Sequence, residues 1–362
     1  MIHDAELATV GSDCAVVHFT AASGAEVVTE VGDVSVTTTG PHHVASFDGL
    51  TSNTEYSLTV AGAETDAFLP ESFRTLAPPS GDLLCTLATV NDLHFGEQVC
   101  GYWSEDPSIG PVFRSAPGEP PYPEVMNAAA VRAITELGPD VVIAKGDLTN
   151  EGEPENVERF LEVYSGAFGD RLAYVRGNHD KTLDGEHVVR EHNGVTFVIL
   201  DTVTPGHPGG RFPSETLGLL AEVARDTAGA VFVFGHHPTY SPDFDDPREL
   251  PFCSTEDDAA ALEATIDAHE NIVGYFCGHT HRNRVRHTPK RRVPNVEVAS
   301  VKEYPGAWAE YRIHADGYLQ MVHRTTDPAA LEWSAQTARM FFGMQREFAI
   351  GQLTDRCFVY RY

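Results

Sequence analysis

The stretch LLCTLATVNDLH, from Leu83 to His94, decides the fold of the larger part of the chain. It starts as a largely apolar run, which is typical of a strand that is covered on both faces. It ends in Asp92 and His94, which share a face because alternate residues of a strand point the same way. The stretch therefore predicts a buried strand that presents two potential metal ligands at its end.

Segments of the same kind follow along the chain, and helical segments alternate with them. We expect further strands over residues 140–144, 172–175, 195–200, 230–234, 272–277, 296–301, 308–314 and 318–323. We expect helices over residues 123–137, 155–168, 214–226, 255–269 and 329–348. Alternating strands and helices predict an α/β fold, with polar blocks gathered at the carboxyl ends of the strands.

Five short polar blocks occupy such strand ends, in the order D-x-H, G-D, G-N-H-D, G-H-x-P and G-H-x-H. Their potential ligands are Asp92, His94, Asp147, Asn178, His236, His279 and His281. Oxygen and imidazole ligands without thiolates suit two borderline divalent cations side by side. Two cations about 3.5–4 Å apart support in-line attack on phosphorus. A single block is only a turn or cap signal, so the prediction depends on all five in order.

The order and residue types of these blocks resemble the calcineurin-like metallophosphoesterases over roughly Leu83 to His323. The resemblance implies a four-layer α/β/β/α sandwich with a dinuclear centre of Mn, Fe or Zn. It assigns the first metal to Asp92, His94, Asp147 and His281, and the second to Asp147, Asn178, His236 and His279. A hydroxide that bridges the two metals would then attack phosphorus in line.

Three other residues of the blocks are expected to act without binding metal. His179 resembles the family's histidine that stabilises the pentacovalent state and protonates the leaving oxygen, so it is the candidate general acid. Asp180 follows it and is expected either to orient that imidazole or to cap a turn. His237 is expected to lie behind the ligand His236 or against the substrate.

Differences between this chain's motifs and those of related families narrow the class of substrate that we expect. Purple acid phosphatases carry a tyrosine three residues after the bridging aspartate, where this chain has Asn150. The D-x-H start, with G-D-L-T-N-x-G in the second block, resembles the bacterial cyclic-nucleotide phosphodiesterases. We therefore expect hydrolysis of a small, cyclic-nucleotide-like phosphodiester. A phosphomonoesterase for nucleotides or sugar phosphates is the alternative, with Arg114, Arg282 and Arg284 as candidates to meet the extra phosphate charge. A non-catalytic binding protein is a remote third reading.

Residues 1–78 are expected to form a separate all-β sandwich, because short β-branched runs alternate there with turn residues. The segment from Leu50 to Tyr56 resembles the tyrosine corner of fibronectin type III modules, in which the tyrosine hydroxyl ties back to upstream backbone. Purple acid phosphatases carry a similar module before their catalytic domain. We expect a packing platform or a ligand-binding module, then a linker (79–82), the catalytic domain (83–326) and a C-terminal helical extension packing on it (327–362).

Composition excludes some partners. The net charge is −28 with 22% charged residues, and an acidic surface has no basic footprint for a nucleic-acid duplex. The chain shows no uninterrupted apolar run of about 18 residues and no leader at its start, so we expect a cytoplasmic protein without a membrane partner. Six cysteines lack CxxC spacing and are expected to be buried thiols. The sequence leaves the oligomeric state open.

Residues 95–123 form a long insertion rich in proline and glycine between the first block and the following helix. It carries several large side chains: Tyr102, Trp103, Phe113, Arg114 and Tyr122. Loops of this length are usually lids, binding loops or disordered segments. Because the insertion starts at the predicted metal site, substrate contact is one expectation for it.

Overall fold

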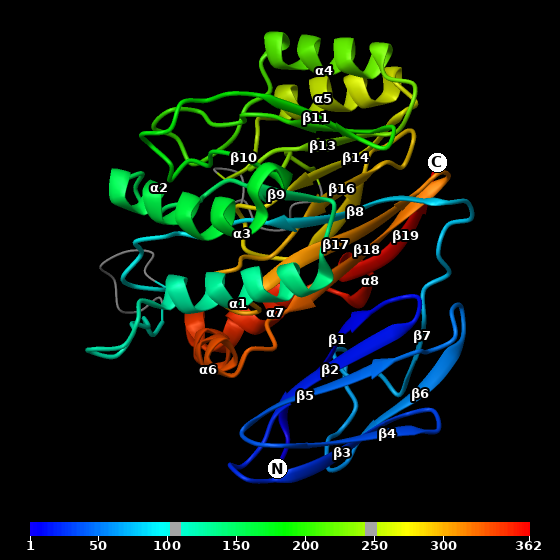
Figure 1. The fold of residues 1–362 in the computed structure, drawn as a ribbon, viewed down its shortest axis with the longest axis vertical. Helices are drawn as coiled ribbons and strands as arrows, with labels where there is room; N and C mark the ends of the chain where they lie inside the picture. The colour runs from blue at the N-terminus through cyan, green and yellow to red at the C-terminus, as the bar shows by residue number, and fades with distance from the viewer. Residues whose placement is uncertain (102–109, 243–251) are drawn as a thin grey trace.

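The computed structural model describes residues 1–101, 110–242 and 252–362 (Figure 1). Its N-terminal part is a small β-sandwich of two sheets. One sheet has the order β1 (His3–Val10), β2 (Cys14–Thr20), β5 (His42–Asp48). The other has the order β4 (Val34–Thr39), β3 (Glu26–Val31), β6 (Glu55–Val60), β7 (Ser72–Arg74).

Apolar side chains from both sheets form the core of this sandwich, among them Val17 and Phe47 from one and Val31 and Leu58 from the other. The predicted tyrosine corner is confirmed, since the backbone N–H of Thr51 donates a 2.8 Å hydrogen bond to the Tyr56 hydroxyl. The all-β character expected for the N-terminal part is therefore correct.

Two six-stranded sheets form the centre of the larger part. The first has the order β10 (Leu172–Val175), β9 (Val141–Lys145), β8 (Leu83–Val90), β17 (Ala307–His314), β18 (Gly317–Arg324), β19 (Cys357–Arg361). The second has the order β11 (Val188–His192), β12 (Val195–Ile199), β13 (Val231–Phe234), β14 (Ile272–Cys277), β16 (Pro294–Glu297), β15 (Arg284–His287). Parallel pairing runs through β8, β9 and β10, and through β12, β13, β14 and β16.

Helices cover the outer face of each sheet (Figure 1). The first sheet is covered by α1 (Tyr122–Leu137), α2 (Pro154–Phe160), α3 (Gly166–Phe168) and α6 (Pro328–Thr337). The second is covered by α4 (Ser214–Asp226) and α5 (Glu256–Ala268). Side chains such as Leu87 and Phe276 fill the space between the sheets. These layers make the predicted α/β/β/α sandwich, and they bring the carboxyl ends of the parallel strands to one edge.

The predicted single helix over residues 329–348 is wrong. After α6 the chain forms a 3₁₀ turn (Met340–Gly343), α7 (Met344–Ile350) and α8 (Leu353–Arg356), and it ends in strand β19. Phe341, Phe342 and Gly343 have φ values of 50°, 57° and 91°, so the backbone there cannot continue a right-handed helix. The expected C-terminal helical extension thus includes a strand that pairs with β18.

Smaller differences have local causes. The strand expected over 296–301 is β16 and spans Pro294–Glu297, and beyond it the backbone N–H of Val301 donates to the carbonyl of Asn91, which follows β8. The helix expected over 155–168 contains a wider π-helical turn at Leu161–Ser165. The described residues contain no helix that is long and apolar enough to cross a membrane. All six cysteines are free, and five are buried, as expected.

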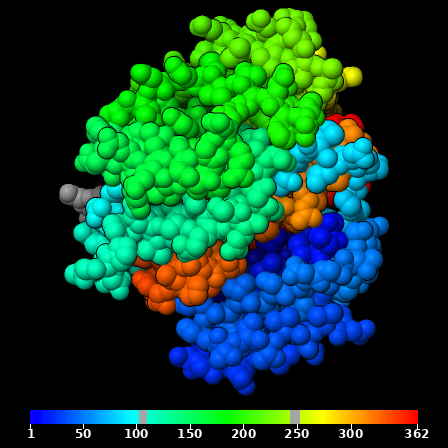
Figure 2. Space-filling model, viewed as in Figure 1, coloured from blue at the N-terminus to red at the C-terminus, as the bar shows by residue number. Residues whose placement is uncertain are grey.

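The N-terminal sandwich packs against the first sheet and the C-terminal helices (Figure 2). The Thr9 hydroxyl donates to the carbonyl of Val322 at 2.7 Å. Glu6 of β1 is fully buried, pairs with Arg324 and accepts a 2.7 Å hydrogen bond from the Tyr304 hydroxyl. The interface therefore contains a buried charge pair as well as apolar contacts.

Replacing Glu6 by alanine is expected to destabilise the protein by about 3–5 kcal/mol, because Arg324 would stay buried without its partner. Denaturant unfolding at equilibrium measures this loss. Glu55, which pairs with Arg74 on the surface of the sandwich, is the control, and its replacement by alanine should cost less than about 1 kcal/mol. Equal small losses for both variants would mean that the Glu6 pair contributes no more than a surface pair.

Candidate metal centre

The five polar blocks lie at the carboxyl ends of β8, β9, β10, β13 and β14. Five of the seven predicted ligands have φ between +48° and +70°: Asp92, His94, Asp147, His279 and His281. A residue with a Cβ atom rarely adopts this conformation, and each instance costs of order 1–3 kcal/mol. Its concentration at one edge of the sandwich indicates a functional arrangement of these side chains.

Glycines in the blocks leave room for the carboxylates of Asp147 and Asp92 to lie close to the backbone. A Cβ atom on Gly177 would lie 2.2 Å from Oδ1 of Asp147. One on Gly278 would lie 2.7 Å from Oδ2 of Asp92. Both distances are shorter than atoms tolerate, so these positions need glycine for the carboxylates to occupy their places.

The first group of side chains comprises Asp92, His94 and His281, whose ligand atoms lie within 4.8 Å of one another. Nε2 of His281 lies 3.2 Å from Oδ1 of Asp92. Burial, together with the nearby Lys302, holds the pKa of His94 well below its ordinary value. The His94 ring is therefore neutral, as a metal ligand must be.

The second group lies around Asp147 and comprises His236 and His279 as well. Oδ2 of Asp147 is 3.2 Å from Nε2 of His236 and 3.6 Å from Nε2 of His94. Nδ1 of His279 is 3.1 Å from Nε2 of His236. Asp147 therefore lies between the two groups, in the position that a ligand shared by two metals requires.

Two histidines of these groups, His236 and His281, have raised pKa values because each lies beside a carboxylate. Burial opposes the charged form of His236, but the Asp147 carboxylate outweighs it and raises the pKa of His236 to about 9. His281 beside Asp92 behaves in the same way, and its pKa rises to about 10. In both pairs a positive charge between a carboxylate and an imidazole is favourable, and a metal ion would supply it.

Several buried atoms of the site have no hydrogen-bond partner among the described residues. They include both ring nitrogens of His94, Oδ1 of Asp92, Oδ1 of Asn178, Nε2 of His237 and Nε2 of His279. A buried polar atom without a partner costs about 1–3 kcal/mol, so native proteins contain few of them. Their gathering beside Asp147 fits a pair of metal ions as the missing partners.

Hydrogen bonds behind the histidines fix which ring nitrogen faces the centre. Nδ1 of His236 lies 2.8 Å from the carbonyl oxygen of Lys145, and Nδ1 of His281 lies 2.9 Å from Oε1 of Glu303. Such contacts set the tautomer and orientation of a metal ligand. In both residues Nε2 is left to face the carboxylates.

A buried lysine connects the supports of His94 and His281. Nζ of Lys302 lies 2.8 Å from Oε1 of Glu97 and 3.4 Å from Oε2 of Glu303. Glu97 in turn lies 3.8 Å from Nδ1 of His94. Burial opposes ionisation of Glu303, but Lys302 and His281 hold its pKa well below the usual value. Sequence reasoning did not find this network, since Lys302 and Glu303 lie outside the five blocks.

Replacing Glu303 by glutamine is expected to weaken metal binding about 10–100-fold, because His281 would lose its charged partner. Calorimetric titration of the metal-free chain with Mn²⁺ measures the change. Glu310, buried and paired with Arg312 and His323, is the matched control. An equal loss of affinity in Glu310→Gln would assign the effect to general destabilisation.

His179 lies beside the two groups, with its ring centroid 4.8 Å from that of His94. Its backbone N–H donates to Oδ1 of Asp147 at 2.9 Å. Its Nδ1 lies 2.7 Å from the carbonyl oxygen of Asn150, which fixes the ring and leaves Nε2 for proton transfer. Asn150 thus orients His179 with its backbone, at the position where purple acid phosphatases carry tyrosine.

Asp180 does not orient the imidazole, and that alternative is wrong. Its carboxylate accepts hydrogen bonds from the backbone N–H groups of Leu148, Thr149 and Gly177 at 2.7–3.0 Å. Burial and the neighbouring Asp147 raise the pKa of Asp180 to about 6. The residue is a turn cap, as the other alternative stated, and it holds the second and third blocks together.

His237 lies next to the second group, with its ring centroid 4.7 Å from that of His279. Its Nδ1 contacts the Thr202 hydroxyl at 2.8 Å, and its carbonyl accepts a 2.6 Å hydrogen bond from Tyr275. It is fully buried. Its ligand nitrogen lies within 4.8 Å of those of His236 and His279, and its Nε2 has no hydrogen-bond partner among the described residues.

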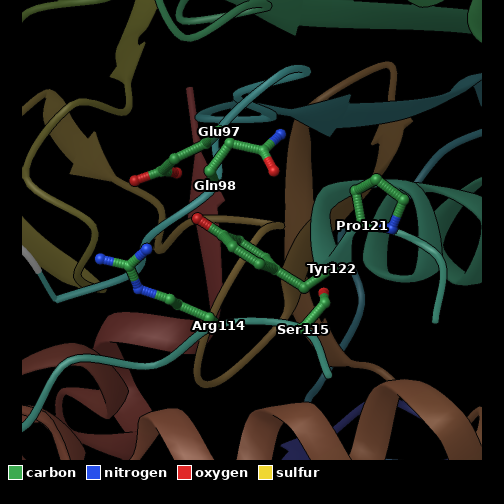
Figure 3. Close-up of a pocket in the computed structure, with 6 residues that line it drawn as sticks. All are labelled: Glu97, Gln98, Arg114, Ser115, Pro121 and Tyr122. Atoms are coloured by element: carbon green, nitrogen blue, oxygen red, sulfur yellow. The ribbon is translucent and has the colours of Figure 1, made fainter. Parts of the chain in front are cut away.

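The three candidate arginines differ in position. Arg282 and Arg284 both bind the buried Glu297, at 3.2 Å and 2.8 Å. Arg114 lines a cavity of about 230 Å³ together with Glu97, Gln98, Ser115, Pro121 and Tyr122 (Figure 3). The side chains of Glu97, Arg114 and Tyr122 extend toward the same side of this cavity. Tyr102 and Trp103 lie outside the described residues.

Comparisons with known proteins identify relatives of part of this chain. A cAMP/cGMP dual specificity phosphodiesterase from Mycobacterium tuberculosis is 29% identical over 164 residues, covering 40% of this chain and 49% of the relative. A glycerophosphodiester phosphodiesterase from Enterobacter lignolyticus is 24% identical over 185 residues, covering 43% of this chain and 63% of the relative. The matched segments thus span less than two thirds of either relative.

A solved structure shares the fold of the larger part. It is a dimetal phosphatase from Danio rerio with a TM-score of 0.51 and 14% identity, covering 68% of this chain and 98% of that chain. The model of the calcineurin-like phosphoesterase family matches residues 86–283, which is more than half of the chain and includes all five polar blocks. The chain therefore belongs to the calcineurin-like phosphoesterase family.

Proposed function

We propose that the chain is a dinuclear-metal phosphodiesterase that hydrolyses a small, cyclic-nucleotide-like phosphodiester, with His179 as the general acid. One observation carries the proposal: Asp147 lies between two groups of buried ligand atoms, several of which have no other partner among the described residues. This donor set contains oxygen and imidazole nitrogen only, which suits Mn, Fe or Zn.

The chain's own residues would hold the two ions in place. Asp92, His94, Asp147 and His281 would hold the first, and Asp147, Asn178, His236 and His279 the second. When bound, such a pair activates water and offsets the charge of the phosphate. The turns that carry the five blocks, and the hydrogen bonds to the Nδ1 atoms of His236 and His281, keep these ligands oriented before substrate binds.

In this proposal His179 donates a proton to the leaving oxygen. The Asn150 carbonyl holds Nδ1, so a protonated ring can give its other proton from Nε2 to the leaving oxygen. The backbone N–H of the same residue holds Asp147. The position of the acid is thereby tied to the position of the shared carboxylate.

The arginines and the relatives favour a diester over a monoester. A monoester dianion carries one more charge than a diester and calls for an additional cationic contact. Arg282 and Arg284 are already engaged by Glu297. Both relatives named above are described as phosphodiesterases. The diester is therefore the proposed substrate class.

The test is turnover of an aryl phosphodiester against the matching aryl phosphomonoester by the Mn²⁺-loaded chain at equal concentration. Preference for the diester is expected, because its single charge needs no further cation. Preference for the monoester would contradict the proposed substrate class and direct attention to Arg114. Arg114→Ala is the comparison variant. Its turnover of the diester should stay within a few fold of the wild-type turnover.

A further inference from the structure

A third cluster of ligand side chains lies away from the centre described above. It comprises Cys85 in β8, Asp140 directly before β9, and His192 at the end of β11. Their ligand atoms lie within 4.8 Å of one another. Cys85 and Asp140 lie near the starts of strands whose carboxyl ends carry Asp92 and Asp147. The cluster is therefore at the opposite edge of the sandwich.

The two sheets meet at this cluster. Cys85 and Asp140 belong to the first six-stranded sheet, whereas His192 belongs to the second. β11 runs antiparallel to β12, so its last residue lies at the edge where the parallel strands begin. A cation held by all three side chains would thus connect the sheets.

The spacing of the polar atoms suits a cation better than a hydrogen bond. Nε2 of His192 lies 3.7 Å from Oδ1 of Asp140, which is too long for a hydrogen bond. Two ligands each about 2.0–2.1 Å from a tetrahedral ion stand roughly 3.4 Å apart. A small closure of the two side chains around an ion would therefore reach bonding distances.

The surroundings hold the ligands in place. The other oxygen of Asp140, Oδ2, accepts a 2.8 Å hydrogen bond from the backbone N–H of Thr86. Asn193 has a φ of 47° in the turn after His192, and its side chain donates to the carbonyl of Leu84 at 3.0 Å. The residues next to His192 and Cys85 are thereby linked directly. Such support is what a preorganised metal site requires.

We propose that Cys85, Asp140 and His192 form a separate site for a single zinc-class divalent cation that joins the two sheets. A thiolate, a carboxylate and a dication sum to zero charge, which suits a site where Cys85 is only 1% exposed. The side chains of His192 and Asp140 are 34% and 44% exposed, so solvent can supply the fourth ligand. The sulfur donor distinguishes this site from the thiolate-free centre around Asp147.

Cobalt substitution tests the site without reference to activity. The full chain is stripped with a chelator, loaded with Co²⁺ and measured by near-ultraviolet absorption and by metal content. The wild-type chain is expected to show a thiolate-to-cobalt charge-transfer band and to hold one more cobalt ion than Cys85→Ser, which should lack the band. Cys14→Ser, which removes another shielded thiol, should keep both.

Three results would overturn the proposal. The first is the absence of a thiolate band when the centre around Asp147 is filled. The second is a band that persists in Cys85→Ser, which would assign it to another cysteine. Since a core substitution can impair folding, His192→Ala at a half-exposed position serves as the second variant. It should also lose the additional ion and the band, and an unchanged metal content would contradict the site. Neither readout depends on the proposed phosphodiesterase activity.

Discussion

Replacing Asp147 by alanine is expected to abolish turnover and to remove metal from both positions of the centre. Its Oδ2 lies within 3.6 Å of both His94 and His236, and its Oδ1 accepts from the His179 backbone. Its carboxylate therefore contacts ligand side chains of both groups. Metal content after gel filtration and turnover of an aryl phosphodiester are the two measurements.

Asp147→Asn is the matched variant, because it keeps the volume of the side chain and loses its charge. It should fold as the wild-type chain does, bind metal more weakly and turn over substrate more slowly. Retained activity of Asp147→Ala at wild-type metal content would remove the bridging assignment. Circular dichroism of both variants separates loss of metal from loss of fold.

Replacing His179 by alanine is expected to keep both metals and to slow turnover by about 10²–10⁴-fold, the usual range for loss of a general acid. The metal ligands should stay in place because the contact from residue 179 to Asp147 comes from the backbone and survives the substitution. Turnover with a series of aryl leaving groups measures the effect. The loss should shrink as the leaving group improves.

Equal losses for good and poor leaving groups would argue against proton donation by His179. His42→Ala is the control histidine variant, since His42 pairs with Glu332 at the interface with the N-terminal sandwich. It should leave the leaving-group dependence unchanged. A His179→Ala chain with reduced metal content would instead indicate that the ring helps to hold the ions.

The gathering of the ligands could be predicted because it follows from local signals. A β-strand that ends in glycine and a ligand side chain occurs four times after Asp92 and His94, and parallel strands bring their carboxyl ends to one edge. The structure places Asp92, His94, Asp147, His236, His279 and His281 together accordingly. Asn178, whose Oδ1 has no partner among the described residues, directly precedes His179, whose backbone N–H binds Asp147.

The supporting contacts of the site could not be predicted because they depend on tertiary packing. The carbonyl of Asn150 orients His179, and a backbone carbonyl leaves no trace in residue type. Glu303 contacts His281, and Lys302 pairs with Glu303, from a segment without a recognisable motif. For this reason the sequence left two roles open for Asp180, which follows His179 directly: orienting the imidazole or capping a turn.

The C-terminal segment shows how tertiary context overrides helix propensity. Residues 329–348 have a helical composition, yet Phe341 and Phe342 adopt left-handed backbone conformations that interrupt the helix. Strand β19 forms by pairing with β18, which lies more than thirty residues earlier in the chain. The consecutive β-favouring residues Phe358, Val359 and Tyr360 were the available signal for this strand.

Electron paramagnetic resonance of the Mn²⁺-loaded chain tests the central claim most directly. Two manganese ions that share Asp147, about 3.5–4 Å apart, should give the spectrum of an exchange-coupled pair. The same spectrum should be lost in Asp147→Ala. At saturating metal, signals of isolated Mn²⁺ alone would contradict a dinuclear centre built on these residues.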